Sequence, residues 1–253
     1  MYEDVCYKKS YLTEVVVRVD LATPIVSFEK NLSSKLVNSI SKSFPIAEPL
    51  DTVGHQFQLG SDGDVKKSEM HRKQWNFFGK KREKQLGINN TSVFIQHKKY
   101  SKFEVLKDEF KMAIEAIDKE HIGAMAQRVG LRYVNNFAID GVNLKEWKKF
   151  ISEELLSTQT FFDNTNNINS LTRLFHIVEL KYTDIDVRFQ FGFPNPDFPA
   201  IMKRPIFVMD IDAYAQIMHP ITESLQFVDV AHRHIQKLFE ESITDELRRK
   251  MNA

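Results

Sequence analysis

The sequence predicts an α+β protein in which two similar halves, residues 1–122 and 123–253, form one compact body. In each half a strand-like run precedes a helix, further strand-like runs follow, and a longer helix ends the half. No change of composition and no flexible linker separates the halves. Segments in this order bury apolar surface by forming an antiparallel sheet with helices packed on one face. The pattern is compatible with one continuous sheet and with two separate sheets.

In the first half, residues 11–21 form the first predicted strand because they include a run of β-branched valines. Ser27 is suited to cap a helix that Pro45 ends. Residues 60–72 are polar and predict a loop. A capping-box sequence at residues 101–104 begins the longer helix. The other predicted strands of this half are 53–59, 74–79, 84–88 and 92–97.

The second half repeats this order and opens with a strand at residues 128–136. Asn143 and Glu146 resemble a capping box for a helix that continues through Leu155. Residues 158–170 are rich in Asn and Thr and predict a mobile loop. The remaining predicted elements are strands at 171–182, 187–193 and 205–212, a helix at 225–239 and a short charged helix from Thr244.

Composition excludes several classes of protein. A formal net charge of +1 does not indicate a nucleic-acid or membrane partner through bulk electrostatics. Cys6 is the only cysteine, so neither an intrachain disulfide nor a thiolate metal cluster can form. The sequence has no signal-peptide-like start and no apolar run of about 18 residues. We therefore expect a cytoplasmic protein with no membrane partner and no cofactor.

Three short segments carry a resemblance to a known family. They are Arg128-x-Gly130-Leu131-Arg132-Tyr133-x-Asn135, Asp210-Ile211-Asp212, and Phe239-Glu240-x-x-Ile243-Thr244-Asp245-Glu246. With the spacing of elements over nearly the whole chain, they resemble a sporadically distributed bacterial family of uncharacterised proteins of about this size. The resemblance implies a bacterial, cytoplasmic α+β protein with no established activity, typical of mobile-element or phage-defence neighbourhoods. The order of elements is also similar to the TATA-box-binding protein fold and to helix-grip folds.

One predicted strand carries the main candidate site. Alternation puts Arg128, Gly130 and Arg132 on one face and Tyr133 and Asn135 on the other, core-like face. Two guanidinium groups beside a bare glycine backbone offer planar forks of donors for a phosphate or carboxylate. The alternative is that both arginines pair with carboxylates of the protein itself. The candidate ligand-binding or partner-binding residues are Arg128, Arg132, Tyr133 and Asn135.

Residues 65–102 form a locally basic stretch, with eleven lysines and arginines and two glutamates. Aromatic residues are interleaved with these charges. Because lysines neutralise phosphates and rings stack on bases, the stretch predicts contact with single-stranded nucleic acid. The alternative is an edge hairpin whose solvated lysines prevent aggregation. The candidate nucleic-acid-binding residues are Trp75, Lys80, Lys81, Arg82, Lys98 and Lys99.

Asp210 and Asp212 share one face of the last predicted strand, and carboxylates at this spacing can bind a hard divalent ion. A metal-dependent hydrolase would need further ligands and a base, and none has motif spacing here. Salt bridges to arginines are the alternative. No catalytic residue is predicted, because the sequence has neither a Gly-rich phosphate loop nor a nucleophile elbow.

These patterns favour a non-enzymatic accessory or regulatory protein that recognises another macromolecule. A protein partner is the first expectation, nucleic acid at the basic stretch is the second, and metal-dependent hydrolysis is the third. The resemblance adds a bacterial defence or mobile-element setting. Because the C-terminal segment carries many acids while residues 65–102 are basic, a head-to-tail contact between copies is also predicted.

Overall fold

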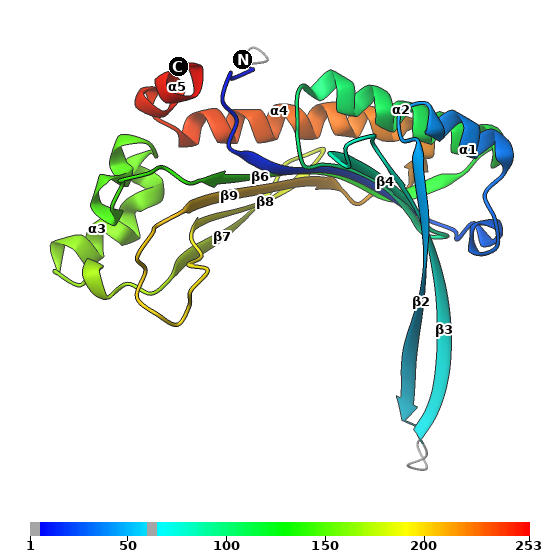
Figure 1. Ribbon diagram of the computed structural model, residues 1–253, viewed down its shortest axis with the longest axis horizontal. Coiled ribbons are helices and arrows are strands. Elements are labelled where there is room, and N and C mark those ends of the chain that lie inside the picture. Colours follow the sequence, from blue (N-terminus) through cyan, green and yellow to red (C-terminus); the bar gives the residue numbers. More distant parts are fainter. Residues whose placement is uncertain (1–5, 60–64) are drawn as a thin grey trace.

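The computed structural model describes residues 6–59 and 65–253, with side chains described except at residues 52–72 (Figure 1). In this part of the chain one antiparallel sheet of ten strands is packed against α2 (Phe103–Glu120) and α4 (Ser224–Ser242). The expected α+β class, with helices packed on a sheet, is confirmed.

The strands of this sheet, the shorter helices and short 3₁₀ segments make up the other elements of the described residues. The strands are β1 (Leu12–Leu21), β2 (Ile46–Leu59), β3 (Val65–Phe78), β4 (Lys84–Ile88), β5 (Ser92–His97), β6 (Met125–Phe137), β7 (Leu174–Lys181), β8 (Asp186–Phe193), β9 (Phe207–Ala215) and β10 (His219–Pro220). The other helices are α1 (Ser34–Ser41), α3 (Ser157–Asn164) and α5 (Asp245–Asn252), and the 3₁₀ segments are η1 (Val26–Glu29), η2 (Leu144–Lys149), η3 (Glu153–Leu156), η4 (Ile168–Ser170) and η5 (Ile221–Glu223).

Strands from both ends of the chain belong to the same sheet. Its order is β2-β3-β4-β5-β1-β6-β9-β8-β7, and β10 pairs with one end of β6. The central pair, β1 and β6, is antiparallel, with Val17 opposite Leu131. A continuous sheet therefore joins the two parts of the chain.

The two faces of the sheet differ sharply. Val15, Val17 and Val19 of β1 are fully buried under the helices, and so is Leu131 of β6. In Figure 1 α1, α2 and α4 all lie along this face, whereas no helix lies flat against the opposite face. An antiparallel sheet tolerates one solvated face, which then carries polar side chains. We call the uncovered side the open face.

The β2–β3 hairpin projects from the sheet as an arm (Figure 1). The two strands pair along their whole length, but β3 pairs with β4 only at residues 75–78. The predicted loop at 60–72 was therefore wrong in its second part, since β3 begins at Val65, whereas residues 60–64 lie outside the described part. Residues 65–72 pair with β2 alone, and their sequence lacks the apolar alternation from which a strand is predicted.

Several predicted helix starts were also wrong. Ser33, and not Ser27, caps α1, through a hydrogen bond from the Leu36 amide to the Ser33 hydroxyl. The N-cap of α2 is Lys102, whose side chain makes no capping bond, so the predicted box at 101–104 does not form. The box of Asn143 and Glu146 does form, but it begins η2 and not a long helix. Backbone pairing of Ile151 with Ile243 interrupts any continuous helix there.

The predicted mobile loop at residues 158–170 was wrong as well. Most of it is ordered as α3 and η4, which precede β7. Gln159 anchors α3, because its buried side-chain amide donates to the carbonyl of Leu144. An isolated Asn- and Thr-rich sequence does not reveal such an anchor, since the partner lies in another segment.

Candidate functional site

The structure divides the four predicted partner-binding residues between two places. Arg128 and Arg132 lie on the open face, while Tyr133 and Asn135 are buried on the helix-covered face. Four residues of extended strand separate the two arginines by roughly 13 Å. At that spacing they do not grip one small anion together, and each has its own carboxylate partner.

Arg132 is held by a fork of two hydrogen bonds to Asp210 on the neighbouring strand β9. Its Nε lies 2.7 Å from Oδ1 and its Nη2 lies 2.5 Å from Oδ2. Asp210 is buried, whereas nearly half of the Arg132 side chain is exposed. The hydrogen bond to Asp210 raises the pKa of Arg132. The pair therefore presents a fixed, half-exposed guanidinium on the open face.

Arg128 has a looser set of partners. Its Nη2 is 3.3 Å from Asp212 Oδ2, and its Nη1 is 3.9 Å from Asp20 Oδ2. The guanidinium also lies 4.8 Å from the ring centroid of Tyr214. A Cβ on Gly130 would come within 3.2 Å of both terminal nitrogens, so glycine leaves room for the guanidinium against the backbone. The arginine ladder, as we call Arg128 and Arg132 with these three aspartates, thus contains charges of both signs.

The aspartates of the ladder offset the positive charge of its two arginines. Burial raises the pKa of Asp212, and the nearby guanidinium groups of Arg128 and Arg132 oppose that rise only in part. Asp210 and Asp212 each face an arginine, and the described residues contain no group of three or more His, Cys, Asp or Glu side chains suited to a metal ion. This arrangement is suited to recognition by charge and hydrogen bonding.

The predicted basic residues gather in two adjoining turns. Lys80, Lys81 and Arg82 lie between β3 and β4, and Lys98 and Lys99 follow β5. The backbone amides of Lys98 and Lys99 donate to the carbonyl of Glu83, at 2.9 and 3.3 Å, which ties the turns together. All five side chains are exposed. We call these five residues the basic turns.

Trp75 lies apart from the basic turns. It pairs with Ile88, at the far end of β4 from the turn that contains Lys80. Its indole N–H donates to the carbonyl of Phe28 at 2.8 Å, and the Lys73 ammonium lies 4.4 Å from the ring centroid. The ring is thus engaged with the protein itself, and the structure does not bring it together with the predicted lysines.

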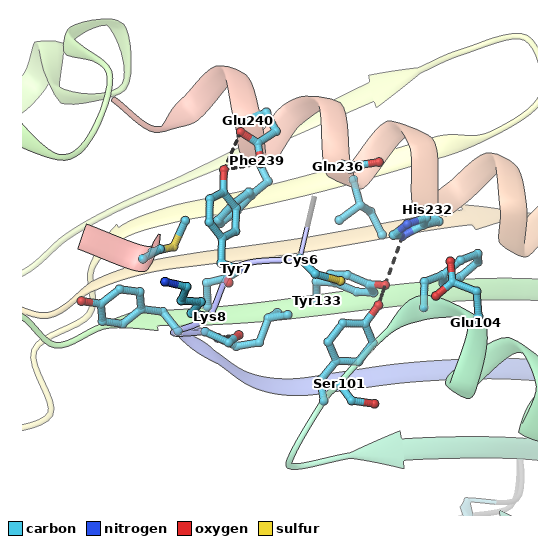
Figure 2. Close-up of a pocket in the computed structure, with 18 residues that line it drawn as sticks. Cys6, Tyr7, Lys8, Ser101, Glu104, Tyr133, His232, Gln236, Phe239 and Glu240 are labelled. Atoms are coloured by element: carbon cyan, nitrogen blue, oxygen red, sulfur yellow. Dashed lines mark hydrogen bonds between the residues drawn. The ribbon is translucent and has the colours of Figure 1, made fainter. Parts of the chain in front are cut away.

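A pocket of about 340 Å³ lies on the helix-covered side of the sheet (Figure 2). Its floor includes Tyr133 and Asn135 of β6, and one wall is the C-terminal half of α4. The segment before β1 and the start of α2 complete it. Alternation on β6 correctly placed Tyr133 and Asn135 on the covered face. No sequence signal linked them to residues of α4 about 100 positions later.

Hydrogen-bonded side chains organise the two ends of this pocket. At one end, the hydroxyls of Tyr100 and Tyr133 are 2.8 Å apart, and the Tyr133 hydroxyl is 3.1 Å from His232 Nδ1. The His232 ring stacks on Phe103, with centroids 3.8 Å apart. Figure 2 shows this chain of contacts running from α4 toward the segment before α2.

At the other end, Tyr7 attaches the N-terminal segment to α4. Its hydroxyl donates to both carboxylate oxygens of Glu240, at 2.8 and 2.9 Å. Glu240 is buried and also accepts from Arg248 Nε at 3.0 Å. Burial, together with the hydrogen bond and charge of Glu240, raises the pKa of Tyr7. Tyr7 therefore stays protonated and keeps donating.

Comparisons with known proteins add no identification. Neither the protein-family models nor the curated proteins gave a match to this chain. No helix of the described residues is long and apolar enough to span a membrane.

Proposed function

We propose that this chain is a non-enzymatic binding protein that holds another protein against its open face. The observation that carries the proposal is the one-sided fold: helices cover one face of the sheet, while the β2–β3 arm and the α3 region extend beyond the other (Figure 1). A broad face that is bounded at both ends offers a partner a defined binding surface. Following the resemblance, the setting would be a bacterial accessory factor in a defence or mobile-element neighbourhood.

The charge pattern of the open face favours protein over nucleic acid. Each guanidinium group of the arginine ladder faces a carboxylate, and Asp20 also pairs with Arg18 of β1, at 2.7 Å. A nucleic-acid surface needs a surplus of positive charge, because affinity comes from phosphate neutralisation. Interspersed charges of both signs instead give register and specificity against a protein surface.

Exposed apolar side chains near α3 add anchoring area. Phe161 of α3 is 60% exposed, and Phe198 and Ile201, in the segment between β8 and β9, are 49% and 57% exposed. Arg173 stacks on Phe198, with its guanidinium carbon 4.2 Å from the ring centroid. Aromatic and arginine side chains contribute disproportionately to protein interfaces.

We further propose that the sheet is built from two tandem halves, as in the TATA-box-binding protein and helix-grip folds. The support is the place of β1 and β6, since each opens its part of the chain and the two pair at the centre of the sheet. In each part a long helix, α2 or α4, follows the strands on the covered face, and the short α5 comes after α4. Fold likeness alone carries no function.

Capture from a bacterial host lysate tests the partner proposal. The double variant Arg132→Gln/Asp210→Asn removes both charges while keeping hydrogen-bonding groups in place. Lys111→Ala, on α2, is the matched control, since its side chain is similarly exposed but lies on the covered side. We expect a protein that wild type and Lys111→Ala retain after nuclease treatment and that the double variant loses. Equal retention by all three would contradict the proposal.

A second candidate function is nucleic-acid binding at the basic turns. The observation that favours it is the hydrogen-bonded junction that brings five exposed cations together. Of these five cations, only Arg82 forms a salt bridge with an acid of the described residues, namely Glu48. Affinity for a single-stranded oligonucleotide should fall steeply with salt, and Lys80→Ala/Lys98→Ala should weaken it. Binding that ignores salt, or no binding at all, would remove this candidate.

A further inference from the structure

The pocket in Figure 2 lies on the opposite side of the sheet from the open face, and its lining has a feature that the proposed function does not use. Asn135 is only 4% exposed and lines the pocket from the floor. None of the side-chain hydrogen bonds within residues 6–59 and 65–253 involves its amide, whose atoms face the space of the pocket and are not sealed from solvent. A polar group that lines a pocket and has no protein partner is available to pair with water or with a polar ligand.

An amide in this position restricts the chemistry of a ligand. Its oxygen accepts and its nitrogen donates, side by side in one plane. The matching edge has a donor next to an acceptor, which is how Asn recognises the edge of a nucleobase. An aliphatic ligand without such an edge would leave the amide unpaired.

The walls favour a flat ring. Tyr7 and Phe239 meet at a centroid distance of 6.4 Å, and Phe103 stacks on His232. Aromatic side chains of this kind pack against planar rings through stacking and edge contacts. The volume of about 340 Å³ is at the lower end of the range for small-molecule sites.

The charges around the pocket argue against an anionic ligand. Its lining includes the carboxylates of Glu104 and Glu240 and the ammonium group of Lys8. The Glu240 carboxylate is already bonded to Tyr7 and Arg248. A phosphate or a free carboxylate would meet more negative than positive formal charge from these three residues.

We propose that this pocket binds a neutral, planar heteroaromatic molecule of nucleobase size, with Asn135 recognising an edge that has a donor beside an acceptor. The site is separate from the open face, so this proposal and the partner proposal stand or fall independently. The Tyr100–Tyr133–His232 chain links the floor of the pocket to the wall formed by α4.

The test is calorimetric titration of the full-length protein with free adenine, guanine, cytosine and uracil, each in turn. We expect at least one base to bind and Asn135→Ala to weaken it about tenfold, as for loss of one well-placed polar contact. Asn136→Ala is the matched control, because this neighbour on β6 has its side chain on the opposite face. Absence of binding by all four bases, or an equal loss in both variants, overturns the proposal.

A second variant keeps the test decisive if Asn135→Ala fails to fold. Ser101 is exposed and lines the pocket. Ser101→Trp adds bulk there without changing the buried floor, so it should abolish base binding while the melting temperature stays near that of the wild type. Unchanged base affinity in a folded Ser101→Trp protein overturns the proposal.

Discussion

At the scale of single residues, side-chain pairs decide what each face of the sheet presents. Alternation along one strand predicted that Arg132 and Asn135 point to opposite faces, and they do. Which carboxylate pairs with which arginine was harder to predict from the sequence, since Asp210 is 78 positions from Arg132 along the chain. Salt bridges were the stated alternative for these arginines and aspartates, and the geometry contains them. Residue type predicts the need for a partner, but topology chooses the partner.

Arg132→Ala should destabilise the protein by about 1–3 kcal/mol, because it leaves the buried Asp210 carboxylate without its fork of donors. Exposure of nearly half of the Arg132 side chain keeps this below the cost of breaking a fully buried pair. Urea denaturation measures the change. The double variant Arg132→Gln/Asp210→Asn should recover much of the loss, and an unchanged midpoint in Arg132→Ala would show that the pair is not structural.

Glu109 of α2 gives a prediction about pH. Burial raises the pKa of Glu109, but hydrogen bonds from His97, at 2.8 Å, and from Lys84 outweigh it, so the pKa is lowered overall. A carboxyl whose pKa is lower in the folded state stabilises the fold above its unfolded pKa, about 4.3, and loses this contribution as pH falls through the folded value. The stability advantage of wild type over Glu109→Gln should therefore be full above about pH 5 and shrink in more acidic solution. Urea midpoints at a series of pH values measure it, and an advantage that grows on acidification would contradict the assignment.

At the scale of elements, strongly periodic segments were predictable and weakly periodic ones were not. The strands β4, β5 and β8 and the helices α2 and α4 follow clear apolar patterns and were expected near their observed bounds. The predicted strands at 53–59 and 74–79 match parts of β2 and β3, but the start of β3 and α3 were missed, because their order comes from strand pairing and from Gln159 and not from their own apolar pattern. The pocket was missed for a related reason, since its walls come from separate elements.

Shortening the arm should leave the body folded. Asp51 and Lys73 are paired across the hairpin. Between this pair and the tip of the arm, β3 pairs only with β2. Replacing residues 52–72 by an Asn-Gly turn should therefore change the melting temperature little, while capture of the protein partner falls if the arm bounds the open face. Thermal denaturation and the lysate capture measure the two effects. Loss of folding would show that the arm stabilises the sheet, and undiminished capture would exclude it from the interface.

At the scale of the whole molecule, the central pair of strands joins the two parts of the chain in one sheet. β1 and β6 pair from Leu12–Asn135 to Leu21–Ala126, and α2 and α4 contact each other over this centre. We therefore expect one cooperative thermal transition, with the calorimetric and van't Hoff enthalpies equal. Residues 1–122 alone should not fold, because β1 would lose its central partner. Two separate transitions in calorimetry would instead indicate two independent domains.

The proposed binding of a protein partner to the open face can be tested directly. The most direct measurement is photo-crosslinking in the host from a benzophenone side chain placed at Arg18, on the open face, or at Lys111, on the covered side. These side chains are 49% and 53% exposed, so the two probes are matched in access to solvent. We expect a discrete crosslinked protein from position 18 and none from position 111. Crosslinks from position 111 alone, or from neither position, would contradict it.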